Sequence, residues 1–135
     1  MKKKVLLDTD TISYYFKRHP QVIVHFNRYI ATHEYIFISR ISIVEILGGL
    51  KAKNAIRQIE NFRNFIAQHK ILDATESSAE ISADIFAELW KKGRHSGNYD
   101  ILIAGMAMAN DLILVTNNTK DYENITGLLL DNWTV

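Results

Sequence analysis

Three short apolar runs, separated by long stretches with helical periodicity, constrain the fold of this chain most strongly. They occupy residues 5–7, 35–38 and 112–115. Each run is almost continuously apolar instead of alternating with polar residues, which is typical of parallel strands buried on both faces. Because helical segments separate the runs, the sequence predicts an α/β fold with a central parallel sheet of about four to five strands flanked by helices.

Helical periodicity covers most of the remaining chain. The predicted helices span residues 11–17, 21–32, 42–50, 54–68, 76–92 and 98–109. The helix at residues 76–92 is the clearest, because four apolar residues share one of its faces. They are Ile81, Ile85, Leu89 and Trp90. Ser77 or Ser78 is the predicted start of this helix, and Gly93 is its predicted stop.

The composition is that of a globular domain, and we expect one domain across residues 1–135. Hydrophobic residues make up 47% and charged residues 23% of the chain, enough to build a packed core. No apolar run approaches the ~20 residues that span a bilayer, and the first residues lack the apolar region of a signal peptide. The lack of cysteine excludes thiolate metal sites and favours the cytoplasm. We therefore expect a cytoplasmic protein that does not associate with membranes.

Four acidic residues are predicted to meet at one edge of the sheet. Asp8 ends the first apolar run, Glu45 follows the second, Asp100 lies near the start of a helix, and Asp121 follows the third run. In open parallel sheets, ligands bind beyond the carboxyl ends of the strands. Clustered carboxylates repel one another unless a cation joins them, and oxygen ligands favour Mg²⁺ or Mn²⁺. The chemistry this predicts is metal-assisted phosphodiester hydrolysis.

Each of these acids has a structural alternative. Asp8 or Asp10 could cap the helix that follows. Ser42 and Glu45 match a capping box, in which the glutamate reaches back to the backbone of the serine. These alternatives stay open, although capping does not require several acids to converge on one edge.

The later two acids have comparable alternatives. Asp100 could favour the positive end of its helix, with Asn98 as the cap. Asp121 could be an acid in a surface turn. Convergence of all four acids therefore favours a chemical role over separate structural roles.

The ordered set of motifs resembles the VapC-type PIN-domain toxins over essentially the whole chain. The shared residues are Leu6 to Ile12, Ser39, Ser42, Glu45, Gly93, Arg94, Gly97, Tyr99, Asp100, Ile103, Ala104, Val115 to Thr119, Gly127, Leu128, Asn132 and Trp133. The resemblance implies a Mg²⁺- or Mn²⁺-dependent endoribonuclease toxin of a type II toxin–antitoxin system. It also implies cleavage of structured RNA, often tRNA, by a homodimer or a higher toxin–antitoxin assembly. A VapB antitoxin, whose tail enters the active-site groove, would neutralise the enzyme.

By the same resemblance, Asp8, Glu45 and Asp100 are the metal-binding catalytic acids. Many PIN domains carry a fourth acid where this chain has Asn118, and in the most similar subgroup an acid three residues later serves instead, which selects Asp121. The hydroxyl of Thr116 and the carboxylate of Asp10 are expected to assist these acids, with capping as the alternative for Asp10.

Basic residues gather in three clusters, at residues 2–4, 51–57 and 91–95, although the formal net charge is only +1. Charge runs usually form solvated surface. If the chain binds RNA, Lys51, Lys53 and Arg94 are the predicted contacts to its backbone, and His95 could touch a phosphate.

Two other functions are compatible with the sequence. The first is a PIN-fold RNA-binding module that has lost catalysis. The second is a phosphohydrolase of the haloacid dehalogenase type, because residues 8–11 resemble its nucleophile motif, with Asp8 as nucleophile and Asp10 as acid and base. That mechanism needs a further lysine and acidic pair after another strand, and only 19 residues follow Thr116.

Overall fold

Each of the first four strands is followed by one or two helices that return the chain across the sheet, which is what parallel strands require. The computed structural model describes residues 3–94 and 97–135. The strands are Val5–Leu7 (β1), Phe37–Ser39 (β2), Lys70–Leu72 (β3), Ile113–Val115 (β4) and Leu130–Asp131 (β5). The helices are Thr9–Phe16 (α1), Pro20–His33 (α2), Arg40–Ala52 (α3), Ile56–Ala67 (α4), Glu76–Lys91 (α5), Asn98–Ala109 (α6) and Thr119–Tyr122 (α7). These elements confirm the predicted α/β class.

β1 lies at the centre of one parallel sheet with the order β3-β2-β1-β4-β5. Leu7 pairs with Ile38 of β2 on one side and with Val115 of β4 on the other. The chain runs outward from β1 to β3 and then crosses back to β4, so the order reverses between β1 and β4. Ligands of open α/β sheets bind beyond the strand ends at such a reversal. The fold therefore makes the carboxyl ends of β1 and β4 the expected position of a site.

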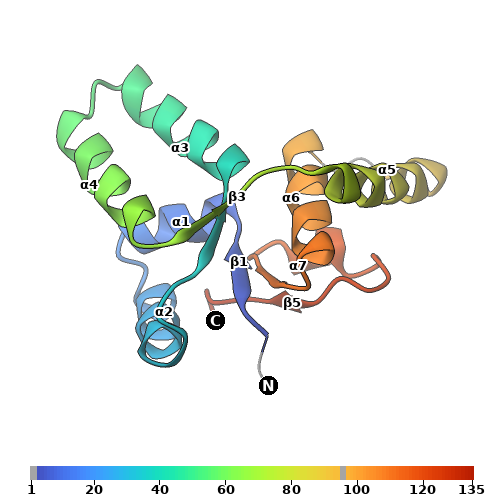
Figure 1. Ribbon diagram of the computed structural model, residues 1–135, viewed down its shortest axis with the longest axis horizontal. Helices are drawn as coiled ribbons and strands as arrows, with labels where there is room; N and C mark the ends of the chain where they lie inside the picture. The colour runs from blue at the N-terminus through green and yellow to red at the C-terminus, as the bar shows by residue number, and fades with distance from the viewer. Residues whose placement is uncertain (1–2, 95–96) are drawn as a thin grey trace.

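Successive residues of β1 face two separate hydrophobic cores. Val5 and Leu7 face a cluster that includes Phe62 of α4, whereas Leu6 faces a cluster that includes Ile103 of α6. Figure 1 shows α1 to α4 on one side of the sheet and α5 to α7 on the other. Each fully buried side chain of this size contributes about 1.5–3 kcal/mol to the stability of the fold. The two cores therefore hold the sheet between two layers of helices.

The two long helices α5 and α6 approach each other closely at Gly105. A Cβ added there would lie 1.9 Å from Ser82 Oγ and 2.8 Å from the backbone oxygen of Ser78. The same Ser82 hydroxyl donates to the backbone oxygen of Ile101 at 3.1 Å. Glycine is required here by the close approach of the helices, and the contact sets the position of α6, which carries Asp100.

The boundaries of the short elements differ most from the predictions. The strand expected at residues 35–38 lies at Phe37–Ser39, and β3, β5 and α7 were not predicted. β3 has three residues and β5 only two, all half-buried or exposed, so neither produces an apolar run. Both are stabilised by backbone pairing with a neighbouring strand, which no local pattern reveals.

The predicted start of α5 at Ser77 or Ser78 is wrong, because Thr75 caps this helix. The Thr75 hydroxyl accepts from the Ser78 amide at 3.1 Å, and the Ser78 hydroxyl accepts from the Thr75 amide at 2.8 Å. The end of the helix was predicted correctly, since Gly93 follows it with a φ of 69°. Trp90, however, lies outside the buried face and stacks on Phe86.

No helix in residues 3–94 and 97–135 is both long enough and apolar enough to cross a membrane. Lys2 and His95, which belong to two of the predicted basic clusters, lie outside the described residues.

Candidate active site

Asp8 lies at the carboxyl end of β1 and is 5% exposed. Its side chain accepts from the Thr11 amide at 2.8 Å, so it caps α1, and its own amide donates to the Val115 oxygen at 3.0 Å. Burial raises the pKa of Asp8, and hydrogen bonds from Thr11 and Thr116 partly oppose this shift. Asp8 therefore caps a helix and also presents a buried carboxylate where the strand order reverses.

Thr116 supports Asp8 from the end of β4. It is fully buried, its side chain bonds to the Asp8 carboxylate, and its oxygen accepts from the Asn118 amide at 3.0 Å. A single hydroxyl proton suffices for both contacts, because it is donated to Asp8 while a lone pair accepts from Asn118. Thr116 thus lies against Asp8, as expected for a residue that assists the acids.

Asp100 lies in the first turn of α6 and is half-buried. Burial raises its pKa, a hydrogen bond from the Tyr122 hydroxyl lowers it, and the charges of three other acids raise it. These acids are Asp10, Glu45 and Asp121. The helix is capped at Gly97 without a side-chain bond, so the proposed cap by Asn98 is wrong. Asp100 is therefore the residue on which the charges of the other acids converge.

Glu45 extends from α3 toward α1. Thr9, the first residue of α1, donates its hydroxyl to Glu45 Oε1 at 2.7 Å, and Thr9 Oγ1 lies 2.8 Å from Ser42 Oγ. Ser39 caps α3, and Ser42 is buried inside that helix. The capping-box interpretation of Ser42 and Glu45 is therefore wrong, because both side chains contact another helix.

The remaining acids are exposed. Asp10 lies in the first turn of α1 and does not cap it. Asp121 lies in the short helix α7 instead of a turn, and Asn118 precedes that helix without capping it through its side chain. The charge of Asp121 raises the pKa values of both Asp100 and Tyr122. Of the two candidates for the fourth acid, Asp121 is the one that adds charge to this edge of the sheet.

The donor set fits a hard divalent cation in its chemistry. Among the described residues, no three acidic, histidine or cysteine side chains lie close enough together to hold a metal ion. Burial is the main cause of the raised pKa of Asp100, and repulsion by the charges of Asp10, Glu45 and Asp121 adds to it. A bound cation would relieve this repulsion, and carboxylate oxygens are the ligands that Mg²⁺ and Mn²⁺ prefer.

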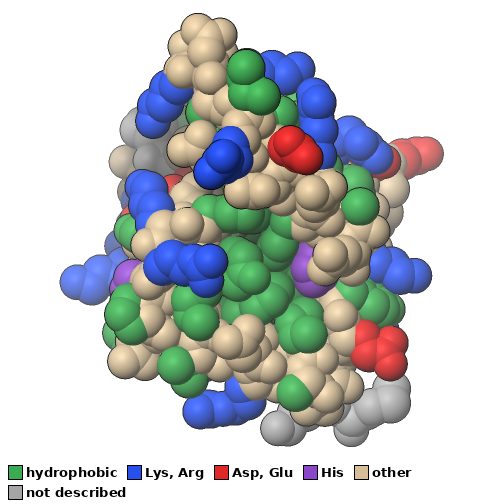
Figure 2. Space-filling view, turned by 90° about the vertical axis from the view of Figure 1, so that its left-hand side faces the viewer, with side chains coloured by type: hydrophobic (Ala, Val, Ile, Leu, Met, Phe, Trp, Pro, Cys, Tyr) green, Lys and Arg blue, Asp and Glu red, His purple; other side chains and the backbone are tan. Residues whose placement is uncertain are grey.

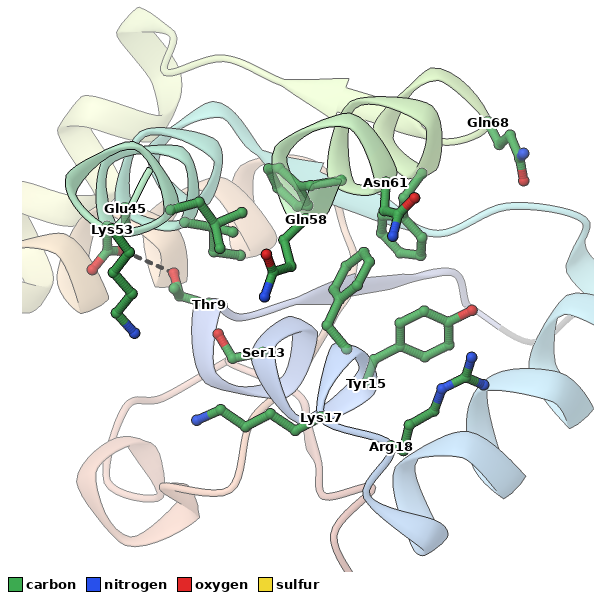
Figure 3. Close-up of a pocket in the computed structure, with 16 residues that line it drawn as sticks. Thr9, Ser13, Tyr15, Lys17, Arg18, Glu45, Lys53, Gln58, Asn61 and Gln68 are labelled. Carbon is green, nitrogen blue, oxygen red and sulfur yellow. Dashed lines mark hydrogen bonds between the residues drawn. The ribbon is translucent and has the colours of Figure 1, made fainter. Parts of the chain in front are cut away.

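A groove of about 860 Å³ extends from Glu45 between α1, α3 and α4. Glu45 and Thr9 line its polar end, and Phe62 and Phe65 belong to its apolar part. Figure 3 shows the hydrogen bond between Thr9 and Glu45, with the side chains of Lys17 and Lys53 on the same side of the view as Thr9. On the side of the molecule that carries α2 and α4, apolar side chains gather in a hollow with lysine and arginine side chains around it (Figure 2).

The three basic residues predicted to contact RNA lie apart from one another. Lys53 lines the groove, whereas Lys51 lines a second, shallower hollow together with Arg63. Arg94 is exposed just beyond α5. Of the three, only Lys53 lines the groove that ends at Glu45.

Sequence reasoning missed three hydroxyl groups of the site, those of Thr9, Ser42 and Tyr122. Thr9 and Ser42 belong to the motifs shared with the VapC-type toxins, but only the packing of α1 against α3 reveals their hydrogen bonds. Tyr122 is 2% exposed, and burial together with the charges of Asp100 and Asp8 raises its pKa. Its place beside Asp121 in the sequence gave no signal of this contact.

Comparison with known proteins shows the family of this chain. A family model described as "PIN domain" matches residues 5–128. The tRNA(fMet)-specific endonuclease VapC of Salmonella typhimurium is 33% identical over 131 residues, covering 96% of this chain and 98% of the relative. Ribonuclease VapC2 of Rickettsia felis is 32% identical over 129 residues, covering 95% and 96%.

Solved structures give the same result. The structure of VapBC2 from Rickettsia felis bound to a promoter DNA fragment has a TM-score of 0.84 at 30% identity, covering 96% of this chain and 98% of that one. DNA-bound VapBC from Salmonella typhimurium has a TM-score of 0.84 at 33% identity, covering 98% and 99%. The chain therefore belongs to the PIN-domain family, and its near-full-length relatives within that family are VapC ribonucleases.

Proposed function

We propose that this protein is a Mg²⁺- or Mn²⁺-dependent endoribonuclease toxin that cleaves structured RNA, with tRNA as the expected substrate. The observation that carries the proposal is that Asp8 is buried where the strand order reverses, while the charge of Glu45 acts on Asp100 and the charges of Asp100 and Asp8 both act on Tyr122. The relatives named as ribonucleases, one of them specific for tRNA(fMet), support it. A role in RNA cleavage agrees with the cytoplasmic location that the composition predicts.

The position of each acid gives its proposed role. Asp8, Asp100 and Glu45 would hold the cation, with Asp121 as the fourth acid. A bound divalent cation activates water and neutralises charge on the phosphodiester. Thr116 and Tyr122 hold Asp8 and Asp100 in place through hydrogen bonds. These bonds preorganise Asp8 and Asp100 before the RNA arrives.

The basic residues along the groove bind the substrate. Lys17 and Lys53 line the same groove as Glu45, so they can hold the RNA backbone while the scissile phosphate reaches the acids. Contacts of this kind are electrostatic and do not depend on sequence.

Removal of the metal is expected to abolish cleavage. With Mg²⁺ or Mn²⁺, the purified protein should cut a total tRNA pool into discrete fragments, and EDTA should prevent this. Asp100→Asn should lower the rate at least about a hundredfold, because it removes the carboxylate on which the other charges converge. Fragments resolved on a denaturing gel give both the rate and the position of the cut.

Asp111→Asn is the matched control, because Asp111 is an exposed acid at the other end of β4 and pairs with Lys3 at 2.7 Å. It should cleave as fast as the wild type. A folded, metal-loaded wild type that binds tRNA without cutting it would instead favour the RNA-binding module. This second candidate is included because, among the described residues, no three acidic, histidine or cysteine side chains lie close enough together to hold a metal ion.

The proposed partner is a VapB-type antitoxin, whose apolar segment would occupy the groove between α1, α3 and α4. The groove combines apolar walls with a basic rim, which suits an amphipathic segment with acidic residues. The solved VapBC relatives support this choice of partner. The proposal includes a homodimer of this chain, which light scattering would measure.

Filling the groove should weaken antitoxin binding. Gly49 of α3 lines the groove, and a Cβ added there meets no atom within 4 Å. We expect Gly49→Tyr to weaken binding at least about tenfold, because a large side chain then occupies the space of the partner. Calorimetry with the antitoxin encoded beside the gene measures this.

Gly48→Tyr is the control, since Gly48 is the neighbouring helical glycine, has equal free space, and does not line the groove. Equal affinity of both variants for the antitoxin would place the partner elsewhere on the protein.

A further inference from the structure

Thr9 connects the helix that follows Asp8 to the helix that carries Glu45. Its Oγ1 lies 2.7 Å from Glu45 Oε1 and 2.8 Å from Ser42 Oγ. An ionised carboxylate can only accept hydrogen bonds, so the single proton of the Thr9 hydroxyl is donated to Glu45. The contact with Ser42 then requires Ser42 to be the donor. The hydrogen bonds therefore form a directed chain from Ser42 through Thr9 to Glu45.

The three residues differ in exposure along this chain. Ser42 is fully buried, Thr9 is half-buried and Glu45 is exposed. An exposed glutamate samples several rotamers unless a bond selects one. The buried end of the chain is held by the core of the protein, so Thr9 transmits that fixed position to an otherwise mobile carboxylate.

The bond is not needed to hold α1 against α3. Ile12 of α1 and Ile43 of α3 are both buried in the same hydrophobic cluster, and apolar contact of this kind holds the two helices together. Loss of the Thr9 hydroxyl would therefore release the Glu45 side chain and leave the helices in place.

We propose that Thr9 is a positioning residue, which holds the Glu45 carboxylate toward Asp8 and Asp100 for binding of the divalent cation. This inference rests on the proposed function, because it concerns the same metal-dependent site. Thr9 acts through Glu45 and does not itself bind the metal.

The test is Mn²⁺ binding to the full-length protein without RNA, measured by calorimetry and by electron paramagnetic resonance of the ion. Thr9→Val keeps the shape of the side chain and removes the hydroxyl, whereas Thr9→Ser keeps the hydroxyl. We expect Thr9→Val to raise the Mn²⁺ dissociation constant about tenfold or more, as loss of a residue that orients a ligand does. Thr9→Ser should stay within about twofold of the wild type, and both variants should unfold in EDTA at the wild-type temperature.

A double-mutant cycle with Glu45→Gln separates positioning from a general structural effect. Once the Glu45 carboxylate is gone, Thr9→Val should cause no further loss of Mn²⁺ affinity, because coupled residues are not additive. If Thr9→Val were to unfold at a lower temperature, Ser42→Ala would replace it, since it removes the first donor of the chain; it should then also weaken Mn²⁺ binding.

The outcomes distinguish this inference from the proposed function. Wild-type binding of Mn²⁺ with no change in Thr9→Val, or an equal loss in the Glu45→Gln background, would overturn the role of Thr9 alone. Failure of the folded wild type to bind Mn²⁺ would overturn both.

Discussion

Asp8→Asn is expected to lower RNA cleavage at least about a hundredfold while the protein unfolds at the same temperature as the wild type or a higher one. Activity is lost because a neutral amide replaces the buried carboxylate at the end of β1. The fold tolerates the change, since asparagine caps helices as well as aspartate does and its oxygen can still accept from the Thr11 amide. Thermal unfolding in EDTA and tRNA cleavage in Mg²⁺ give the two values.

The pH dependence of this variant tests the cause. Burial raises the pKa of Asp8 in the folded protein above its ordinary value of 3.8, so the folded state binds this proton more tightly than the unfolded state. Asp8 therefore contributes to the free energy of unfolding at low pH, and this contribution is lost as the pH rises through the raised pKa. The stability advantage of Asp8→Asn in EDTA should shrink as the pH falls from about 7 toward about 4.

Measuring the difference between variant and wild type removes contributions from other groups. Burial lowers the pKa of His69, so protonation of this residue on acidification destabilises both folded proteins equally. Addition of Mn²⁺ should raise the unfolding temperature of the wild type and leave that of Asp8→Asn unchanged. An Asp8→Asn protein that cleaves tRNA at the wild-type rate would remove Asp8 from the site.

Gly105→Ala is expected to destabilise the protein by about 3 kcal/mol. The new Cβ would lie 1.9 Å from Ser82 Oγ, 2.8 Å from the Ser78 oxygen and 3.0 Å from the Ser82 nitrogen. The serine hydroxyl can turn away, but the two backbone atoms can move only if α5 and α6 separate. Urea unfolding measures the loss, and because α6 carries Asp100, cleavage should fall as well.

Two variants check this explanation. Gly48→Ala replaces a helical glycine whose Cβ would meet no atom within 4 Å, so it should stabilise the protein by about 0.5–1 kcal/mol. Adding Ser82→Ala to Gly105→Ala should recover only part of the loss, since the backbone clashes remain. A Gly105→Ala protein as stable as the wild type would show that the helices separate at little cost.

Membership of the PIN-domain family also decides among the interpretations of the first motif. The family model matches residues 5–128, and Asp10 is exposed in α1 while Asp8 is buried beside Thr116. These observations do not support the dehalogenase-type alternative, in which Asp8 is the nucleophile and Asp10 the acid and base.

The local pattern was most informative where burial is strongest. β1 and α6 begin and end at the predicted residues, and the run at residues 112–115 contains β4. These segments are apolar because they face a core on both sides or on most of their surface. Consecutive residues of the sequence therefore show where they lie. The same logic placed Asp8 and Asp100 at element ends.

Long-range contacts account for the errors. The spacing of Ser42 and Glu45 satisfies a capping box, but Ser39 starts the helix earlier, and Thr9, 36 residues before Glu45, accepts from one side chain and donates to the other. A local pattern contains no information about a partner so distant in the sequence. The edge strands β3 and β5 were missed for the same reason, since backbone pairing across the sheet stabilises them.

The sequence alone therefore indicated an α/β fold and the acids at its strand ends, because hydrophobic periodicity and helix boundaries are local properties of the chain. Only the tertiary structure showed that the strand order reverses between β1 and β4, that the hydroxyls of Thr9, Thr116 and Tyr122 hold three of those acids, and that a groove leads from Glu45 between α1, α3 and α4. These features depend on which distant segments pack together, and packing is decided by the free energy of the whole fold.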